Sequence, residues 1–376
     1  MDGKIVFWFV FLPVAWLGCV SLNCVSVTAQ TADAPASTKP DARFLRWDKN
    51  KDMRLTRDEL PSAIRGNFDR VDTDQSGWIS LDEHFSFLNR TAEPSSDSLE
   101  DMKTLKNLAY VKQGHERHRL DLYLPQVRPS AAELPLIIWV HGGGWKNGSK
   151  DRFAHLNPLL QRGFAVASIN YRLSQHATFP AQIHDCKAAI RYLRKNAQRF
   201  GLDPKKFGVW GSSAGGHLVA LLGTSGEVSE LEGNLGTVDV SSRVQAVCDW
   251  FGPTDLLKMN QQAGATGKID HDAPGSPESL LVGAPIQEVP EKTNKINPIA
   301  YVTADDPPFL IMHGDQDRLV PFQQSQMLDD ALKAAGVSTT LILVQGAGHG
   351  LKNQRDRQRA IDFFANQFLD SGKTKK

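Results

Sequence analysis

The chain has 376 residues, 41% of them hydrophobic and 23% charged, which are ordinary proportions for a folded globular protein. These proportions exclude disorder of the whole chain, and the length allows about two domains, or one large domain with an appendage. The balance of 43 Lys+Arg against 42 Asp+Glu leaves a formal net charge of +1. Such a chain has no basic field for nucleic acid or for an anionic membrane surface, so we expect neither partner.

The N-terminus carries an export signature. Residues Ile5–Val20 are almost wholly apolar, follow Lys4 and precede the small-residue tract Val27-Thr28-Ala29, which predicts a cleaved secretory signal over residues 1–29 and a periplasmic or secreted protein. At about 1.5 Å per residue this stretch falls short of the ~20 residues that cross a bilayer, so we expect no stable membrane span. Leu17-Gly18-Cys19 is a partial lipidation box, which leaves a lipoprotein anchor as the alternative.

Cleavage of this signal would leave two of the four cysteines, Cys186 and Cys248. Four cysteines are too few for a disulfide scaffold. In an oxidising compartment the remaining two could pair if the fold brings them together, and the sequence leaves that pairing open.

Two acidic 12-residue loops, 24 residues apart, follow a Thr-, Ala- and Pro-rich linker over residues 30–39. Each places oxygen-bearing residues at positions 1, 3, 5, 9 and 12 and uses a backbone carbonyl at position 7, as an EF-hand does to enclose calcium. Residues 40–90 resemble the short EF-hand pairs of exported bacterial proteins. The candidate calcium ligands are Asp48, Asn50, Asp52, Arg54 and Glu59 in the first loop, and Asp72, Asp74, Ser76, Trp78 and Glu83 in the second.

The two loops differ at position 6, where the chain needs a positive φ. Gly77 suits that position in the second loop, whereas Met53 in the first carries a left-handed cost of roughly 1–2 kcal/mol, so we expect weaker calcium binding there. Apolar residues recur at helical spacing after each loop, which predicts a helix shared between the loops and a second one behind them; these residues are Leu60, Ile64 and Phe68, then Leu81, Phe85 and Leu88. The pair is expected to be a structural or docking module, followed by a linker over residues 91–106.

From residue 107 to 372, apolar runs alternate with amphipathic stretches, which predicts an α/β domain with a doubly wound, mainly parallel sheet. The expected strands are His118–Leu124, Leu136–Val140, Ala165–Asn170, Phe207–Trp210, Val244–Trp250, Phe309–Met312 and Thr340–Val344, and the expected helices are Pro180–Gln198, Ala214–Leu222, Phe322–Ala335 and Gln354–Leu369.

A G-x-S-x-G motif, Gly211–Gly215, joins one of these strands to the helix that follows. This is the setting of a nucleophile elbow, in which the serine sits on a tight strand-to-helix turn and the glycines avoid clashes. The motif selects Ser213 as the candidate nucleophile, and the N–H of Ala214 as half of an oxyanion hole. Upstream, His141–Trp145 reads HGGGW, and its Gly143 and Gly144 are the candidates for the other half.

The candidate base and acid follow from chain order, which in this fold runs Ser, Asp, His. His349 lies in a glycine-rich loop after the last strand and is preferred over His141, His217 and His313, which are expected to shape local backbone. The segment His313–Pro321 supplies the acid, Asp317, with Asp315 as the alternative. The three candidates Ser213, Asp317 and His349 are separated by 104 and 32 residues.

The motifs HGGGW, WGSSAGGH, HGDQDRLVP and GAGHG, with the segments Ile169–Leu173 and Asp249–Asp255, resemble a known group. The chain is similar to exported bacterial α/β-hydrolase esterases of the feruloyl-esterase and acetyl-xylan-esterase type, relatives of the hormone-sensitive-lipase group. The resemblance implies an α/β-hydrolase fold, supports Asp317 as the acid, and implies a carboxylic ester substrate such as an acetyl or feruloyl ester of a polysaccharide.

The segment Leu256–Ala300 has no sustained hydrophobic period and lies between two core strands, so we expect a lid or a wall of the acyl pocket there. Trp145 and Tyr171 could line the site or belong to the core. The predicted mechanism is two-step acyl transfer without an organic cofactor, and calcium belongs to the N-terminal loops. Three alternatives remain: a serine exopeptidase of the same fold, a long-chain lipase, and a calcium-dependent adhesion module without catalysis.

Overall fold

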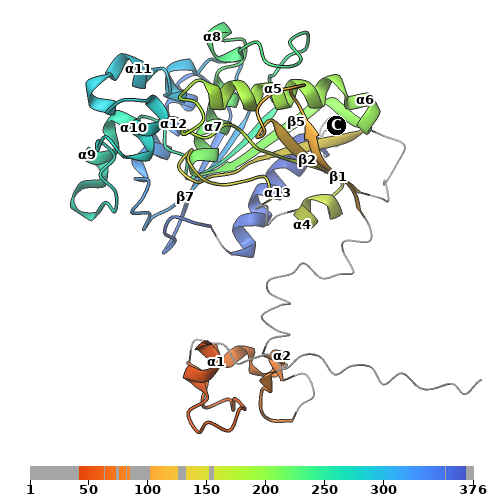
Figure 1. The fold of residues 1–376 in the computed structure, drawn as a ribbon, viewed down its shortest axis with the longest axis vertical. Coiled ribbons are helices and arrows are strands. Elements are labelled where there is room, and N and C mark those ends of the chain that lie inside the picture. The colour runs from red at the N-terminus through yellow and green to blue at the C-terminus, as the bar shows by residue number, and fades with distance from the viewer. Residues whose placement is uncertain are drawn as a thin grey trace, which may run out of the picture. The chain divides into compact units, whose positions relative to one another are not determined.

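The computed structural model describes residues 42–62, 64–72, 76–81, 83–84, 102–125, 133–151, 156–351 and 353–369. The chain divides into two compact units, residues 1–92 and 93–376 (Figure 1). The expected signal, the linker over residues 30–39 and most of the linker over residues 91–106 lie outside the described residues. Among the helices that are described, none combines the length and the apolar character needed to cross a membrane.

In the smaller unit, helix α1 (Ala42–Trp47) and helix α2 (Phe68–Val71), which follows the 3-10 turn η1 (Arg65–Asn67), contribute side chains to one apolar cluster. Leu55 and Ile79, each at position 8 of its loop, exchange two backbone hydrogen bonds of 3.0 and 2.8 Å in an antiparallel bridge. The cluster consists of Phe44, Leu55, Leu60, Phe68, Val71 and Ile79, with Trp47, Ile64 and Leu81 packed against it.

The expected continuous helix between the two loops was wrong. Leu60 and Ile64 precede the helical residues, which begin only at Arg65. Pro61 explains part of this difference, because its fixed φ and missing N–H restrict the chain to the first turn of a helix or to a bend. Leu60, Ile64 and Phe68 still pack in the same apolar cluster. Phe85 and Leu88, expected on the helix after the second loop, lie outside the described residues.

The larger unit is built on one eight-stranded sheet with the order β1-β2-β4-β3-β5-β6-β7-β8. Strand β2 runs antiparallel to β1 and β4, and the other pairs are parallel. This confirms the expected mainly parallel sheet. The strands are β1 (Met102–Ala109), β2 (Arg119–Pro125), β3 (Leu134–Val140), β4 (Ala165–Ile169), β5 (Leu202–Ser212), β6 (Ala246–Trp250), β7 (Phe309–Gly314) and β8 (Thr339–Val344).

All seven strands expected from the sequence are present, and β1 is an eighth that was not predicted. It begins at Met102, within the segment expected as a linker, so the sheet starts before residue 107. The edge position explains the omission. Because β1 pairs only with β2 and its residues are partly or fully exposed, its sequence MKTLKNLA lacks the apolar run of a central strand.

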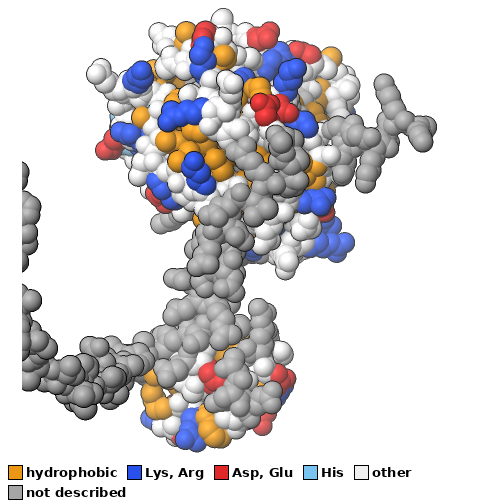
Figure 2. Space-filling model, turned by 90° about the vertical axis from the view of Figure 1, so that its right-hand side faces the viewer, with side chains coloured by type: hydrophobic (Ala, Val, Ile, Leu, Met, Phe, Trp, Pro, Cys, Tyr) orange, Lys and Arg blue, Asp and Glu red, His pale blue; other side chains and the backbone are white. Residues whose placement is uncertain are grey.

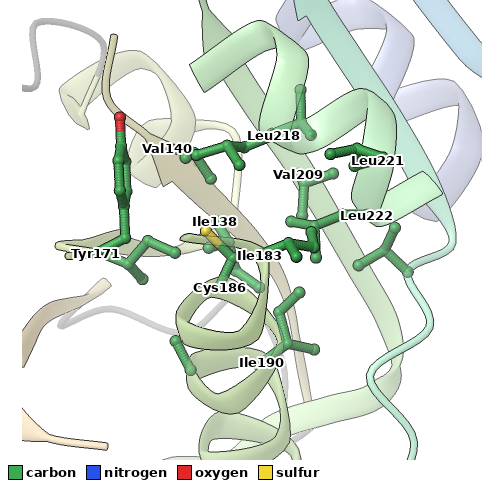
Figure 3. Packing of buried hydrophobic residues seen from close by; sticks show 14 of the residues in the cluster. Ile138, Val140, Tyr171, Ile183, Cys186, Ile190, Val209, Leu218, Leu221 and Leu222 are labelled. Carbon is green, nitrogen blue, oxygen red and sulfur yellow. The ribbon is translucent and has the colours of Figure 1, made fainter. Parts of the chain in front are cut away.

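Helices cover both faces of this sheet, which gives three layers (Figure 1). Side chains of α5, α7 and α12 join the apolar cluster on one face, part of which is shown in Figure 3, and those of α4 and α13 join the cluster on the other. The helices are α4 (Leu156–Gln161), α5 (Ala181–Lys195), α6 (Ala197–Phe200), α7 (Ala214–Thr224), α8 (Ser229–Glu232), α12 (Gln323–Ala334) and α13 (Gln354–Phe368).

The segment Leu256–Ala300, which has no sustained hydrophobic period in its sequence, contains several short helices. None of them exceeds six residues, which is too short for a hydrophobic period to appear in the sequence. They are η3 (Leu256–Lys258), α9 (Met259–Ala263), η4 (Gly264–Thr266), α10 (Pro277–Val282), η5 (Ile286–Glu288), α11 (Pro290–Asn294) and η6 (Pro298–Tyr301).

The two cysteines of the larger unit do not pair. Both are free and buried. Cys186 packs in the cluster of α5 and α7, whereas Cys248 packs in the cluster of α4 and α13, so the sheet separates them. On the face of the larger unit shown in Figure 2, basic and acidic side chains are interspersed, in keeping with the neutral overall balance.

Candidate active site

Ser213 occupies a sharp turn between β5 and α7. It is the N-cap residue of α7 with φ 55° and ψ −123°, a strained conformation for a residue with a side chain. The flanking glycines make the turn possible. A Cβ on Gly211 would lie 2.2 Å from the Gly215 carbonyl oxygen, and one on Gly215 would lie 2.1 Å from that of Val140. The turn therefore has the geometry that the motif predicts.

His349 lies between Ser213 and Asp317. Its Nε2 is 3.0 Å from Ser213 Oγ, and its Nδ1 is 2.7 Å from Asp317 Oδ2. We assign the tautomer in which Nδ1–H donates to the carboxylate, because Nε2 then accepts the hydroxyl proton of the serine. The Phe251 ring meets the imidazole edge-to-face at 4.8 Å. The structure thus brings together the three residues that chain order selected.

Asp317 is fully buried at its side chain and is held by several donors. Oδ1 accepts the backbone N–H groups of Leu319 at 2.8 Å and Val320 at 3.0 Å. Burial by itself raises the pKa of this carboxyl, but hydrogen bonds from His313 and His349, the charge of His349 and the Val320 N–H outweigh burial. They hold the pKa of Asp317 well below its usual range. The residue therefore stays an anion that accepts from His349 throughout the working range of an enzyme.

The alternative acid and bases have other partners. Asp315 Oδ1 accepts the Gly346 N–H at 2.7 Å and so anchors the loop after β8. His141 and His217 are buried, and burial lowers the pKa of each to about 4. His217 Nε2 lies 2.9 Å from the Ile296 carbonyl oxygen, and His313 Nδ1 lies 2.7 Å from Ser325 Oγ. His313 also approaches Asp317, with its Nε2 3.4 Å from Oδ2, the same oxygen that accepts from His349.

The glycine loop after β3 lies against the elbow. A Cβ on Gly142 would lie 2.6 Å from the Ser212 carbonyl oxygen, and one on Gly143 would lie 2.4 Å from that of Asn147. Gly143 and Gly144 have φ values of +115° and +59°. The Gly143 carbonyl accepts the Asn147 N–H at 3.0 Å, which closes the loop into a tight turn. At Gly142 and Gly143 only glycine fits without a shift of the backbone.

A cavity of about 470 Å³ opens over these groups. The glycine loop, the elbow and His349 form its base, and the segment between η3 and η6 forms part of its wall, as expected for a lid or pocket wall. Trp145 lines the cavity and also packs in the core cluster, whereas Tyr171 belongs to the core alone and stacks on His141 at 4.3 Å. The lining residues beyond the segment Gly142–Trp145 and the elbow are Lys146, Asn147, Phe251, Pro253, Ile269, His271, Pro277, Glu278, Leu319, Val320 and His349.

Two of these lining residues, His271 and Glu278, were not predicted from the sequence. Both come from the segment without a hydrophobic period, and they are only seven residues apart, so no motif marks them. The one signal that could have found part of the pair is that His271 is the only histidine between Leu256 and Ala300.

In the smaller unit, the two acidic loops repeat the same hydrogen bonds. Asp48 Oδ2 accepts the Met53 N–H and Asp72 Oδ2 accepts the Gly77 N–H, both at 3.0 Å. Met53 and Gly77 both have the positive φ expected at position 6, with values of 63° and 87°. At position 12, Glu59 Oε2 and Glu83 Oε2 each accept a backbone N–H and a hydroxyl from position 9, at 2.8–2.9 Å. Asp74 lies outside the described residues.

Comparison with known proteins identifies a family and several relatives of this chain. The sequence profile of the BD-FAE family matches residues 120–332. Esterase LipC of Mycobacterium tuberculosis is 34% identical over 219 residues, which cover 57% of this chain and 53% of LipC. A solved structure, a truncated form of a carbohydrate esterase from gut microbiota, is 37% identical with a TM-score of 0.66 and covers 73% of this chain and 98% of that one.

A second solved structure is an acetyl ester-xyloside bifunctional hydrolase from Caldicellulosiruptor lactoaceticus. It is 25% identical with a TM-score of 0.53 and covers 66% of this chain and 88% of that one. The chain spans about half the length of the curated relatives it matches.

The fold, together with these relatives, defines the class as α/β-hydrolases of the esterase type. Within that class, the chain belongs to the BD-FAE family.

Proposed function

We propose that the protein hydrolyses carboxylic esters through an acyl-enzyme formed on Ser213, with His349 as base and Asp317 as the orienting acid. The observation that carries this proposal is the hydrogen-bonded chain from Ser213 Oγ through His349 to Asp317, with distances of 3.0 and 2.7 Å, at the base of a cavity. Nucleophile, base and acid within hydrogen-bond reach are the requirement for nucleophilic catalysis by serine.

In the first step, Ser213 Oγ attacks the ester carbonyl carbon while its proton passes to His349 Nε2. The carbonyl oxygen becomes an oxyanion, and the backbone N–H groups of Gly143, Gly144 and Ala214, residues that line the cavity, would stabilise it. The tetrahedral intermediate collapses when the C–O bond to the alcohol breaks. The alcohol oxygen leaves with the proton that His349 holds, and the acyl group stays on Ser213.

The second step repeats the chemistry with water as the nucleophile. His349 takes a proton from water, the hydroxide adds to the acyl carbon, and the collapse returns the proton to Ser213 Oγ and releases the carboxylic acid. Asp317 keeps the proton of His349 on Nδ1 throughout, so that Nε2 alone exchanges protons with the substrate. The side chains of Ser213, His349 and Asp317, with the loop amides, supply every group that these steps need.

We further propose acetyl or feruloyl esters of polysaccharides as the substrates. The motif resemblance and the carbohydrate esterase among the structural neighbours support a carbohydrate ester. The named acetyl ester-xyloside hydrolase supports an acetyl group. The cavity of about 470 Å³ has room for an acyl group of either kind.

The direct test is hydrolysis of p-nitrophenyl acetate by the wild type and by Ser213→Ala. We expect turnover by the wild type and a loss of kcat of at least about 10³-fold in the variant, because the acyl-enzyme cannot form. Equal activity of the two proteins would overturn the serine mechanism. Cleavage of aminoacyl p-nitroanilides at a higher kcat/KM than any ester would instead favour a serine exopeptidase of this fold.

We also propose that residues 40–90 form a calcium-binding EF-hand pair on an exported protein. The repeated hydrogen bonds of the two loops and the antiparallel bridge between Leu55 and Ile79 support this proposal. Carboxylates at positions 1 and 12 of both loops supply the hard oxygens that calcium prefers. Asp48 and Glu59 would hold one ion, and Asp72 and Glu83 the other, together with the remaining loop oxygens.

Calcium would bind the carboxylates at positions 1 and 12 of each loop together and so stabilise the smaller unit. We expect the melting temperature of that unit to fall when a chelator is added and to recover with excess calcium. An unchanged melt would argue against the calcium module. Export is tested separately, by the N-terminal residue of the mature protein, which is expected to follow Ala29.

A further inference from the structure

Two polar side chains of the insertion line the cavity and pair with each other. His271 Nδ1 lies 2.9 Å from Glu278 Oε1. His271 is 1% exposed and Glu278 is 4% exposed, although both line the cavity. Placing a histidine and a carboxylate in a largely apolar wall costs free energy unless their polar atoms are satisfied.

Half of the polar atoms of this pair remain unsatisfied. Among the residues that the structure describes, neither His271 Nε2 nor Glu278 Oε2 has a hydrogen-bond partner, and both atoms are shielded from bulk water. We assign to His271 the tautomer in which Nδ1–H donates to the carboxylate, so that Nε2 is an acceptor, and Glu278 Oε2 is an acceptor as well. The wall thus holds two acceptors that lack donors, which is a costly arrangement in a protein interior.

The backbone around the pair is well anchored. The His271 N–H donates to Asn260 Oδ1 at 2.7 Å. Glu278 lies in the first turn of α10, whose N-cap residue Ser276 accepts the Ser279 N–H at 3.0 Å. Pro277 packs beside the glycine loop after β3, since a Cβ on Gly144 would lie 3.2 Å from the Pro277 Cβ. The backbone on both sides of the pair is therefore anchored, and Pro277, next to Glu278, lies against the glycine loop that would hold the reacting carbonyl.

We propose that His271 and Glu278 form a hydroxyl-binding subsite for the alcohol part of the ester. This inference rests on the esterase function proposed above. Hydroxyl groups next to the ester oxygen donate to His271 Nε2 and Glu278 Oε2 as the substrate enters, with a small adjustment of the two side chains that exposes these atoms to the cavity. The acyl group takes the apolar part of the cavity, which is formed by Phe251, Leu319 and Val320. The substrate class is an ester of a polyhydroxylated alcohol.

Two acetates of equal carbon number test this assignment. Glycerol 1-acetate carries two neighbouring hydroxyls on the alcohol part, and n-propyl acetate carries none. Acid release by the full chain in a pH-stat gives kcat/KM for both. Because satisfied acceptors favour the hydroxylated ester, we expect the wild type to prefer glycerol 1-acetate by about 10-fold or more.

Two variants test the residues themselves. Glu278→Gln keeps the shape of the side chain but offers an amide N–H₂ where an acceptor stood, and His271→Phe removes the second acceptor. We expect the ratio of the two kcat/KM values to fall toward about 1 in both. A matched control is His118→Asn, which breaks another buried histidine–carboxylate pair, with Asp185 at 3.0 Å, that does not line the cavity. Its ratio should equal that of the wild type even if its melting temperature falls.

A wild-type ratio near 1, or a high ratio that both variants retain, would overturn the subsite. If neither variant folds, the test is the wild-type ratio of kcat/KM for glycerol 1-acetate to that for n-propyl acetate.

Hydrolysis of p-nitrophenyl acetate distinguishes failure of the subsite from failure of the proposed esterase function. Turnover of that ester with a ratio near 1 overturns the subsite only, whereas no turnover of any of the three esters overturns the esterase function and the subsite with it.

Discussion

Replacing Asp317 with asparagine tests the role of the buried carboxylate in the site. Asp317 Oδ1 accepts two backbone N–H groups, from Leu319 and Val320, while Oδ2 accepts from His349 at 2.7 Å. An asparagine has one acceptor oxygen. If that oxygen keeps the two backbone donors, the amide N–H₂ faces His349 Nδ1 and favours the tautomer with the proton on Nε2. That tautomer cannot accept the proton of Ser213.

The magnitude follows from the same geometry. For unit charges at the 2.7 Å that separate His349 from Asp317, with an effective dielectric constant of about 20, the attraction is on the order of 6 kcal/mol before desolvation is subtracted. Together with the wrong tautomer, this predicts that kcat/KM for p-nitrophenyl acetate falls about 10³- to 10⁴-fold in Asp317→Asn, or about 4–5.5 kcal/mol.

The matched control is Asp315→Asn, because Asp315 lies two residues away and bonds the Gly346 N–H rather than His349. We expect this variant to lose less than about 10-fold in kcat/KM, since the amide oxygen can keep that hydrogen bond. A loss of less than about 10-fold in Asp317→Asn, or an equal loss in both variants, would refute the assignment of the acid.

Three further predictions concern the oxyanion loop, a buried carboxyl and the smaller unit. Gly143→Ala places a Cβ 2.4 Å from the Asn147 carbonyl oxygen at a φ of +115°, so kcat should fall about 10²-fold or more, and unaltered kcat would speak against this loop as the oxyanion hole. Burial raises the pKa of Asp249 from 3.8 to about 6. As pH rises, this carboxyl therefore ionises in the unfolded chain before it does in the folded chain, and the folded state loses stability between pH 3.8 and about pH 6. Asp249→Asn should therefore raise the free energy of unfolding at pH 7 by up to about 3 kcal/mol and have little effect at pH 3, measured by urea titration, and a gain that is the same at both pH values would contradict this. Glu83→Gln should weaken calcium binding measured by calorimetry about 10-fold or more, because it removes a charged ligand at position 12, and unchanged affinity would count against the proposed ion site.

The parts of the site that are local in sequence could be predicted from it. The elbow around Ser213 and the glycine loop follow strands with strong apolar patterns, and their glycines are required by close backbone contacts at the turns themselves. His349 and Asp317 lie far from Ser213 in the chain, but the order of elements in this fold placed both at the same edge of the sheet.

The polar wall of the cavity could not be predicted, because its signal is three-dimensional. His271 and Glu278 meet through a loop and one short helix, and the cavity between this wall and the glycine loop depends on how the insertion folds back over the sheet. Strand β1 was missed for a related reason. An edge strand buries little of its surface, so its sequence carries only a weak pattern.

The central claim, that an acyl group passes through Ser213, is tested most directly by intact-protein mass spectrometry of the enzyme quenched during turnover of p-nitrophenyl acetate. p-Nitrophenolate is a good leaving group, so the acyl-enzyme forms rapidly from this ester and accumulates when its hydrolysis is the slower step. We expect one acetyl group per chain, located on the peptide that contains Ser213, and none on the Ser213→Ala protein. An acetyl group that forms equally without the Ser213 hydroxyl, or steady turnover by Ser213→Ala at the wild-type rate, would contradict the claim.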